Sequence, residues 1–192
     1  MIAAVLTMSL QLNAQTRFGF RAGGNLSQMK VNGNTPVFSN KNFKGYHAGI
    51  IADIALTSKL YLQPQLSYVR KGATFERSTE EGSQKIRIDY AELGTNLVYK
   101  KATSVGKLFA GAGVAGSYGF TGTQEVNAQK SDLYKKTSYW DRFDVGLNLT
   151  AGLELYNGMF ISINSQKGFL DAYQGPGSIK HRSLSLSVGY FL

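Results

Sequence analysis

Hydrophobic and polar residues alternate without interruption between residues 142 and 156, which is unusually long for a β-strand. Side chains point to alternate faces of a strand, so this segment is predicted to have one apolar and one polar face. At roughly 3.3 Å per residue it would extend about 50 Å. A tilted strand needs only about 9–11 residues to cross a bilayer, so this one could span it and project beyond. The apolar face consists of Phe143, Val145, Leu147, Leu149, Ala151, Leu153 and Leu155.

Seven other segments repeat the pattern, and the connections between them alternate between long and short. The eight predicted strands cover residues 17–26, 45–56, 60–72, 86–99, 108–120, 142–156, 159–169 and 179–192. The short connections follow the second, fourth and sixth strands, and Asn157-Gly158 is a strong hairpin signal. Short turns at one end and long loops at the other are typical of membrane barrels. The sequence therefore predicts an all-β protein, an eight-stranded antiparallel up-and-down transmembrane β-barrel.

Three local features refine this prediction. Pro64 lies inside a predicted strand, which indicates a bulge or a skipped ladder bond. Between residues 86 and 99 the apolar parity changes from Ile88 and Tyr90 to Leu93, which suggests an extra residue near Ala91. Aromatic residues near the strand ends fit two interfacial girdles. We expect Tyr46, Tyr68, Tyr90, Phe120 and Phe143 near the long loops, and Phe18, Tyr99, Tyr156 and Phe160 near the short turns.

The polar parity carries charges of both signs among small residues, which suits the narrow interior of an eight-stranded barrel. In this interpretation the apolar parity faces lipid and a closed sheet leaves no open edge. The predicted lumenal network consists of Arg17, Arg21, Asp53, Arg87, Asp89, Arg142, Asp144, Glu154 and Arg182. The opposite orientation, a soluble barrel with an apolar interior, is the alternative.

The N-terminal segment and the composition limit the other classes of protein. Residues 2–12 are mostly apolar and are followed by Asn13-Ala14, so residues 1–14 are predicted to be a secretory signal peptide and residues 15–192 the barrel domain. The chain has no Cys, which excludes disulfides and thiol catalysis. Its formal net charge is +9, but the basic residues are spread along the chain, so no nucleic-acid partner is expected.

Several short segments resemble a known family. Residues 18–27 read FGFRAGGNLS, residues 45–49 read GYHAG, and residues 62–68 read LQPQLSY followed by Lys71-Gly72. These resemble the small porin-like, PorT-like outer-membrane β-barrel proteins of Bacteroidetes, and the resemblance covers essentially the whole mature chain. Residues 90–94, YAELG, depart from it, since Gly94 stands where that family tends to have Pro. The resemblance implies an outer-membrane barrel without catalytic residues.

Two motifs could indicate chemistry. Residues 111–116 match the dinucleotide fingerprint G-x-G-x-x-G, but the alternation continues through Phe120 where a helix would be needed. His47 could join Asp53 and a serine in a hydrolase triad, yet no nucleophile motif accompanies them. His47 and His181 are too few for a His-based metal site. Small residues facing the lumen and a lumenal polar network explain both patterns. We therefore expect no catalysis, no cofactor and no metal.

The expected partners follow from the predicted location. The loop at residues 121–141 is basic and aromatic, and Lys130, Tyr134, Lys135, Lys136, Tyr139 and Trp140 form a possible surface-recognition loop for lipopolysaccharide or glycan. The simpler interpretation of the same residues is a solvated loop with an interfacial Trp. The loop at residues 31–42 is a second recognition candidate. The alternating last strand, ending in Phe191-Leu192, is similar in kind to the signal read by the barrel-assembly machinery. The chain is predicted to be a monomer in the bacterial outer membrane, with periplasmic termini and extracellular long loops. An enzyme that modifies lipid A and a soluble periplasmic ligand-binding barrel are the rival functions.

Overall fold

The computed structural model describes residues 16–32, 38–77, 83–126, 129–134, 142–169 and 178–192, and ten strands lie within them. The strands are β1 (Thr16–Asn32), β2 (Phe38–Lys41), β3 (Phe43–Ala55), β4 (Leu60–Arg77), β5 (Ser83–Ala102), β6 (Gly106–Val126), β7 (Gln129–Asp132), β8 (Phe143–Leu155), β9 (Met159–Gly168) and β10 (Ser178–Phe191). Among these residues, no helix is both long and apolar enough to cross a membrane. The predicted signal peptide lies outside the described residues.

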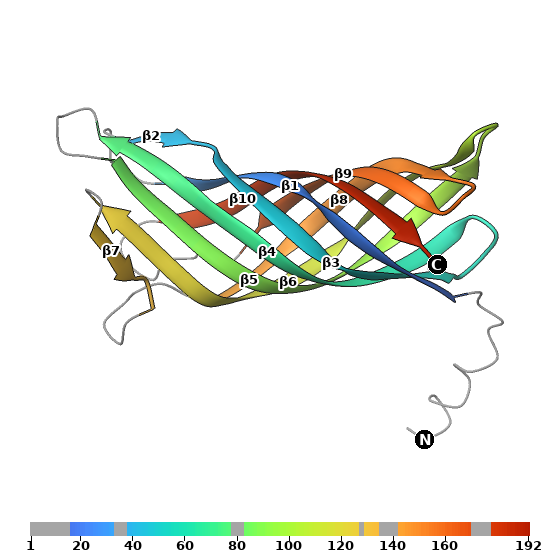
Figure 1. Ribbon diagram of the computed structural model, residues 1–192, viewed down its shortest axis with the longest axis horizontal. Helices are drawn as coiled ribbons and strands as arrows, with labels where there is room; N and C mark the ends of the chain where they lie inside the picture. Colours follow the sequence, from blue (N-terminus) through green and yellow to red (C-terminus); the bar gives the residue numbers. More distant parts are fainter. Residues whose placement is uncertain (1–15, 33–37, 78–82, 127–128, 135–141, 170–177) are drawn as a thin grey trace, which may run out of the picture.

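Eight of these strands form a closed antiparallel barrel (Figure 1). Each of β1, β3, β4, β5, β6, β8, β9 and β10 pairs with the next barrel strand, and β1 pairs with β10 to close the sheet. The short strands β2 and β7 are additions at one end, where β2 pairs with β4 and β7 pairs with β6. The fold is therefore the predicted up-and-down barrel of eight strands, with the two short strands lying in regions predicted to be loops.

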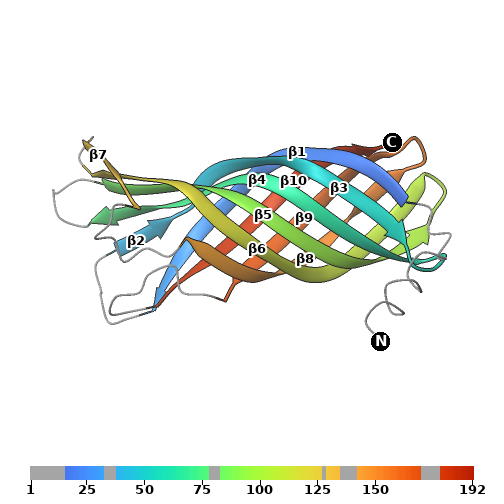
Figure 2. The same ribbon diagram turned by 90° about the horizontal axis from the view of Figure 1, so that it is seen from below.

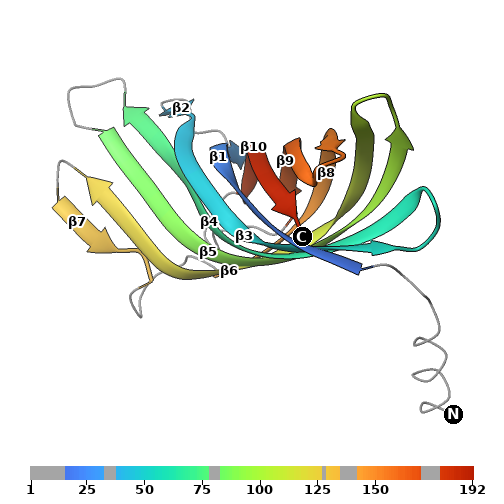
Figure 3. The ribbon, with the colours of Figure 1, turned by 45° about the vertical axis from the view of Figure 1, so that its right-hand side comes forward.

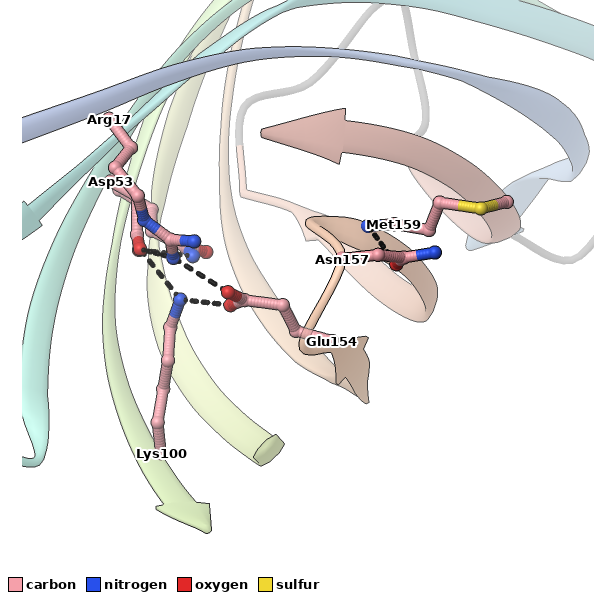
Figure 4. A network of polar contacts seen from close by, with 7 residues as sticks. Arg17, Asp53, Lys100, Glu154, Asn157 and Met159 are labelled. Atoms are coloured by element: carbon pink, nitrogen blue, oxygen red, sulfur yellow. Dashed lines mark hydrogen bonds and ion pairs between the residues drawn. The ribbon is translucent and has the colours of Figure 1, made fainter. Parts of the chain in front are cut away.

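The short turns gather at one end of the barrel, and the C-terminus lies there too (Figure 3). The turn after β8 is tight because Gly158 has a φ of 90°, a left-handed conformation that glycine adopts without strain. The Gly158 amide donates to the Leu155 carbonyl at 3.0 Å, and Asn157 Oδ1 accepts from the Met159 amide at 3.0 Å (Figure 4). We call this end of the barrel the turn end and the opposite end the loop end.

Over most of the barrel, apolar side chains point outward and polar side chains point inward. Leu93 and Leu149 are 66% and 62% exposed on the outer wall, whereas Asp53 is completely buried inside. The burial pattern of β8 alternates between exposed and buried from Phe143 to Ala151. The polar groups inside pair with one another, and the exposed apolar wall suits an apolar surrounding. This is the arrangement predicted for a membrane barrel.

Strands β4, β5 and β6 continue toward the loop end (Figure 2). In this part of the barrel the inner face is apolar and the outer face of β5 is charged, the reverse of the arrangement elsewhere. Here an apolar cluster fills the inside of the barrel, and Leu133 beyond β7 covers it. Its buried members are Val69, Ala73, Ile86, Ile88, Tyr90 and Leu133. The outward residues of the same part of β5 are charged, namely Lys85, Arg87 and Asp89. We call this part of the molecule the loop-end extension.

This inversion corrects the predicted bulge near Ala91. The alternation of β5 keeps one phase throughout, so that Ile88, Tyr90 and Glu92 all point inward. The irregularity lies instead in the pairing with β6, where the register shifts between Asp89 and Tyr90. The partners of these two residues are Thr121 and Gly119, so Phe120 is the extra residue and β6 carries the bulge.

Pro64 lies in the middle of β4 without changing its register. The pairing of β3 with β4 includes Ile51 with Gln65 and Ile54 with Leu62, but the positions between them are not paired. On the other side, Pro64 pairs with Thr95 of β5 in an unbroken ladder. Proline has no amide hydrogen to donate, so pairing is lost beside Pro64. This is the skipped ladder bond, one of the two outcomes that the sequence predicts.

Aromatic rings form clusters on the outer wall near both ends of the apolar band. At the loop end, Tyr68 lies 5.8 Å from Tyr46 and 6.0 Å from Phe120 between ring centroids. At the turn end, Phe20 and Tyr190 are 6.1 Å apart. Two predicted girdle residues do not belong to this wall. Tyr90 is buried in the apolar cluster, and Phe160 packs inside the barrel against Phe191, at 4.9 Å between centroids.

Candidate functional site

Four charged side chains from four strands meet inside the barrel near the turn end (Figure 4). Arg17 reaches Asp53 at 2.6 Å and Glu154 at 2.7 Å. Lys100 reaches the same two carboxylates at 2.7 Å and 2.6 Å, and Gln63 donates to Asp53 Oδ1 at 2.9 Å. Two cations and two anions therefore compensate each other, which a buried ionic group requires.

Aromatic rings enclose this group on the side of Lys100. Its Nζ lies 4.5 Å from the centroid of the Tyr61 ring and 5.2 Å from that of Phe191. The Arg17 guanidinium lies 4.8 Å from the same Phe191 ring. An ammonium close to the face of a ring is attracted by the ring quadrupole. These ring contacts help to hold both cations in place.

A second polar network occupies the middle of the interior. Lys71 of β4 contacts Glu92 of β5 at 2.7 Å and also donates to Gln166 of β9. Glu92 Oε2 accepts further hydrogen bonds from Ser117 at 2.9 Å and from Gln166 at 3.0 Å. The carboxylate thus has three donors from three different strands. This network bridges opposite walls of the barrel, because β9 and β4 are not neighbours in the sheet.

Two small cavities lie among these interior side chains. A cavity of about 20 Å³ lies beside Arg21, Lys71 and Glu92, and one of about 10 Å³ lies beside Arg21 and Phe160. A cavity needs roughly 10–15 Å³ of space open to a water-sized sphere to hold one water molecule. Each cavity is therefore about the size of a single water.

His47 is part of the buried interior. Its Nε2 forms a hydrogen bond with Ser187 Oγ at 2.8 Å, and both residues are nearly inaccessible to solvent. Asp53, the carboxylate that could have completed a triad, is bound by Arg17, Gln63 and Lys100 at the turn end. A cavity of about 20 Å³ adjoins His47. Among the described residues, the carboxylate that a triad would need is therefore engaged elsewhere, and the cavity beside the Ser–His pair is about the size of one water.

The structure brings together some of the predicted lumenal residues and not others. Arg17, Asp53 and Glu154 form the ion group at the turn end, while Arg21 and Asp144 are buried elsewhere in the interior. Arg142 lies just before β8, with its guanidinium 4.4 Å from the centroid of the Tyr134 ring. That contact holds Tyr134 at the edge of the apolar cluster.

Three of the predicted lumenal residues instead lie on the outer wall. Arg87 and Asp89 alternate with the buried Ile88, so they point outward from the loop-end extension. Asp89 forms an ion pair there with Arg70, whose guanidinium lies 5.0 Å from the centroid of the exposed Tyr46 ring. Arg182 shares the parity of the outward Leu184 and is exposed. The sequence pattern misplaces Arg87 and Asp89 because the polarity inversion in β5 resembles a change of parity.

Sequence reasoning missed three members of the interior networks, Lys71, Glu92 and Lys100. The signal was present, since Lys71 shares the parity of Gln65 and Ser67 in β4. Lys100 likewise alternates with the outward Leu97 and Tyr99. A strictly applied alternation would have placed both lysines inside. Which carboxylate each one contacts depends on the stagger between strands, which no local pattern records.

The two predicted recognition loops lie mostly outside the described residues. Of the six residues singled out in the second loop, Lys130 is exposed on β7 and Tyr134 packs against the apolar cluster. Lys135, Lys136, Tyr139 and Trp140 fall outside the described part of the chain. Tyr134 is thus a packing residue, which corrects its proposed role as a surface aromatic.

The other chemical motif is part of a strand. Gly111, Gly113 and Gly116 all lie within β6, which continues to Val126, so the helix required by a dinucleotide site does not follow them. Among the described residues, no group of three His, Cys, Asp or Glu side chains could hold a metal ion.

This architecture is that of the bacterial outer-membrane barrels. The model of the family described as "Outer membrane protein beta-barrel domain" matches residues 11–174. The chain belongs to this family, and the family indicates the bacterial outer membrane as its location. No curated protein matches the sequence.

Solved structures show the same fold at low sequence identity. Neisserial surface protein A is 13% identical with a TM-score of 0.50, over 90% of this chain and 96% of that one. Ail, the attachment invasion locus protein of Yersinia pestis, is 15% identical with a TM-score of 0.51, over 92% and 98%. The outer membrane protein OprG from Pseudomonas aeruginosa is 11% identical with a TM-score of 0.51, over 93% and 97%. At these identities the likeness concerns the fold alone.

Proposed function

We propose that this protein is a non-catalytic, monomeric outer-membrane barrel with a structural or surface-interaction role and a lumen that does not conduct. In this proposal both termini are periplasmic and the long loops are extracellular. The placement of the C-terminus beside the short turns supports this orientation, because membrane barrels have short periplasmic turns and longer extracellular loops (Figure 1).

Interior side chains that pair or pack at three levels of the barrel carry the proposal. The Arg17–Asp53–Lys100–Glu154 group occupies the turn end, and the Lys71–Glu92 network occupies the middle. The apolar cluster around Ile88 then occupies the loop end. An ion crossing this interior would have to break buried ion pairs at two levels, which costs several kcal/mol at each, on the order measured for single buried pairs.

Electrical recording tests the closed lumen directly. The purified barrel is inserted into planar lipid bilayers after heat-modifiable migration on a gel has shown that it is folded. We expect the wild-type protein to give no steady single-channel steps. A Lys71→Ala/Glu92→Ala variant serves as the comparison, because it removes the widest-reaching contacts of the middle network. Reproducible unitary currents from the folded wild-type protein would contradict the proposal.

The absence of catalysis is proposed from the surroundings of His47. Its hydrogen bond to Ser187 is buried, and the adjoining cavity has about 20 Å³. The rival function is modification of lipid A, so the test compares lipid A composition in cells that express the wild type or His47→Gln. We expect identical profiles. A lipid A species that depends on His47 would support the enzyme instead.

The finer assignments rest on sequence. We propose membership in the porin-like, PorT-like branch from the segments at residues 18–27, 45–49 and 62–68. Lipopolysaccharide and the barrel-assembly machinery are the proposed partners, the latter through β10, whose pairing with β1 completes the barrel. The rival, a soluble periplasmic barrel, predicts release from membranes by high salt. We expect the protein to remain in the membrane fraction.

A further inference from the structure

Two cations face each other on the outer wall near the loop end. Arg182 of β10 and Lys167 of β9 are register partners in the antiparallel ladder. Both are exposed, and both share the parity of outward apolar residues such as Leu184 and Ile163. Like charges directly opposite each other in a sheet are unfavourable. This pair therefore stabilises nothing within the barrel.

No acidic side chain in the described part of the chain points outward on this wall. Among the described residues of β1, β3, β8, β9 and β10, the acidic side chains are Asp53, Asp144 and Glu154, and all three point inward. The other register partners of the two cations are Gln28 and Leu147. Arg70 on the other side of the barrel differs, because Asp89 neutralises it at 2.6 Å.

Next to the two cations the outer wall is hollowed. A hollow of about 650 Å³ is lined by Arg182 and Lys167, by the leucines Leu26, Leu147, Leu149 and Leu184, and by polar residues that include Gln28, Asn42 and Ser165. A second hollow, of about 550 Å³, shares Leu26 and Leu184 and adds Ile163, Leu186 and a third exposed cation, Lys44. Gly24 lies on its floor, where an added Cβ would meet nothing closer than the Gly45 carbonyl oxygen at 3.9 Å.

The order of residues along β9 and β10 shows which end of this surface is charged and which is apolar. On β10 the apolar Leu184, Leu186 and Val188 run from Arg182 toward the turn end, and on β9 Ile163 and Ile161 do so from Lys167. The cations thus lie at the edge of the apolar band, at the level where lipid headgroups begin. An occupant must present negative charge at this edge and hydrocarbon below it.

We propose that the outer wall formed by β9, β10, β1 and β3 binds a lipid with a phosphorylated headgroup. Arg182 and Lys167 bind one phosphate, Lys44 approaches the headgroup from the other side, and an acyl chain lies over Leu26 and Leu184. Arginine suits this role, because its planar guanidinium binds two phosphate oxygens at once. This inference rests on the proposed orientation in the membrane, and it concerns the barrel wall rather than the loops.

Native mass spectrometry of the full-length barrel tests this site. The barrel is reconstituted into phosphatidylcholine vesicles containing equal amounts of bisphosphorylated lipid A and its dephosphorylated form, then extracted in mild detergent. We expect the wild-type barrel to retain the bisphosphorylated lipid preferentially. Each basic residue near an anionic lipid surface strengthens binding by a factor of about 5. The double variant Arg182→Gln/Lys167→Gln should therefore reduce the preference for the bisphosphorylated lipid by roughly 30-fold.

The control variant is Lys59→Gln/Lys101→Gln, which removes the same charge from exposed residues at the turn end. It should keep the wild-type preference. Equal retention of the two lipids, an equal loss in the control, or a bound second copy of the chain in place of lipid would overturn the inference. Failure of the barrel to enter vesicles would overturn the proposed function as well, whereas normal insertion without lipid selectivity would overturn this inference alone.

Discussion

The membrane band, as we call the part of the barrel with an apolar outer wall, and the loop-end extension share strands β4, β5 and β6. Their inner and outer faces have opposite polarity. In the band, Leu93 and Leu97 of β5 point outward while Glu92 and Lys100 point inward. In the extension, the outward residues of β5 are charged and the inward ones are apolar. The phase of the strand does not change between the two regions. What changes is the medium outside the wall, since the family belongs to the outer membrane.

This difference shows that face polarity reports the surroundings rather than the strand. Within hydrocarbon, polar groups are satisfied only inside, so ion pairs and hydrogen bonds fill the interior. Beyond the band, the outer face meets water, and the inner face can pack an apolar cluster as a soluble sheet does. Two kinds of core therefore follow each other along one barrel, and each should respond to mutation in its own way.

The largest expected effect lies in the ionic core. Lys100→Met leaves Asp53 and Glu154 with Arg17 as their remaining cation, and both carboxylates stay buried. Removing one partner of a buried ion pair costs about 3–5 kcal/mol, so the free energy of unfolding should fall by that amount. Urea titration of the barrel in vesicles measures it. Lys101→Met, at the exposed neighbouring position, is the control and should change little.

A charge on the outer wall separates the band from the extension. Leu149→Arg places a cation on the lipid-facing wall and should cost up to about 2–4 kcal/mol in the free energy of unfolding, since the cost of a lipid-facing Arg rises toward the midplane. Thr121→Arg places the same charge on the outward face of β6 opposite Asp89, where the change should stay within about 0.5 kcal/mol. Equal costs at both sites, in the same titration, would remove the distinction.

Loss of one methylene should matter only in the apolar core. Ile88 is 1% exposed, so Ile88→Val leaves a gap that the cluster cannot fill and should cost about 0.5–1.5 kcal/mol. Leu93→Val, on the same strand but facing outward, should cost less because lipid chains fill the space. The two midpoints of urea unfolding provide the comparison. A larger effect at Leu93 would show that the wall there packs against protein.

The smallest effect is expected at the half-buried surface ion pair of the extension. Arg70→Gln removes its contacts with Asp89 and with the Tyr46 ring. Exposed pairs contribute about 0.2–1 kcal/mol, and salt weakens them further. The difference in unfolding free energy between wild type and variant should therefore shrink as salt concentration rises. A difference that is independent of salt would mean that the pair is shielded from water.

The sequence predicted the eight strands, their closure and the outward position of the aliphatic residues, because each depends on alternation along one strand. It failed where two causes produce the same pattern. An inversion of polarity in β5 looks like a shift of one residue, and this error placed Arg87 and Asp89 in the lumen. The partners of Lys71 and Lys100 depend on the stagger between distant strands, so no single segment could reveal them.

The most direct test of the central claim is the surroundings of the outward residues along β5. The chain contains no cysteine, so single substitutions Arg87→Cys, Asp89→Cys, Leu93→Cys and Leu97→Cys each carry one spin label in vesicles. We predict that labels at 93 and 97 collide mainly with oxygen dissolved in lipid, and that labels at 87 and 89 collide mainly with a water-soluble nickel chelate. Water accessibility at 93 and 97 equal to that at 87 would contradict the account.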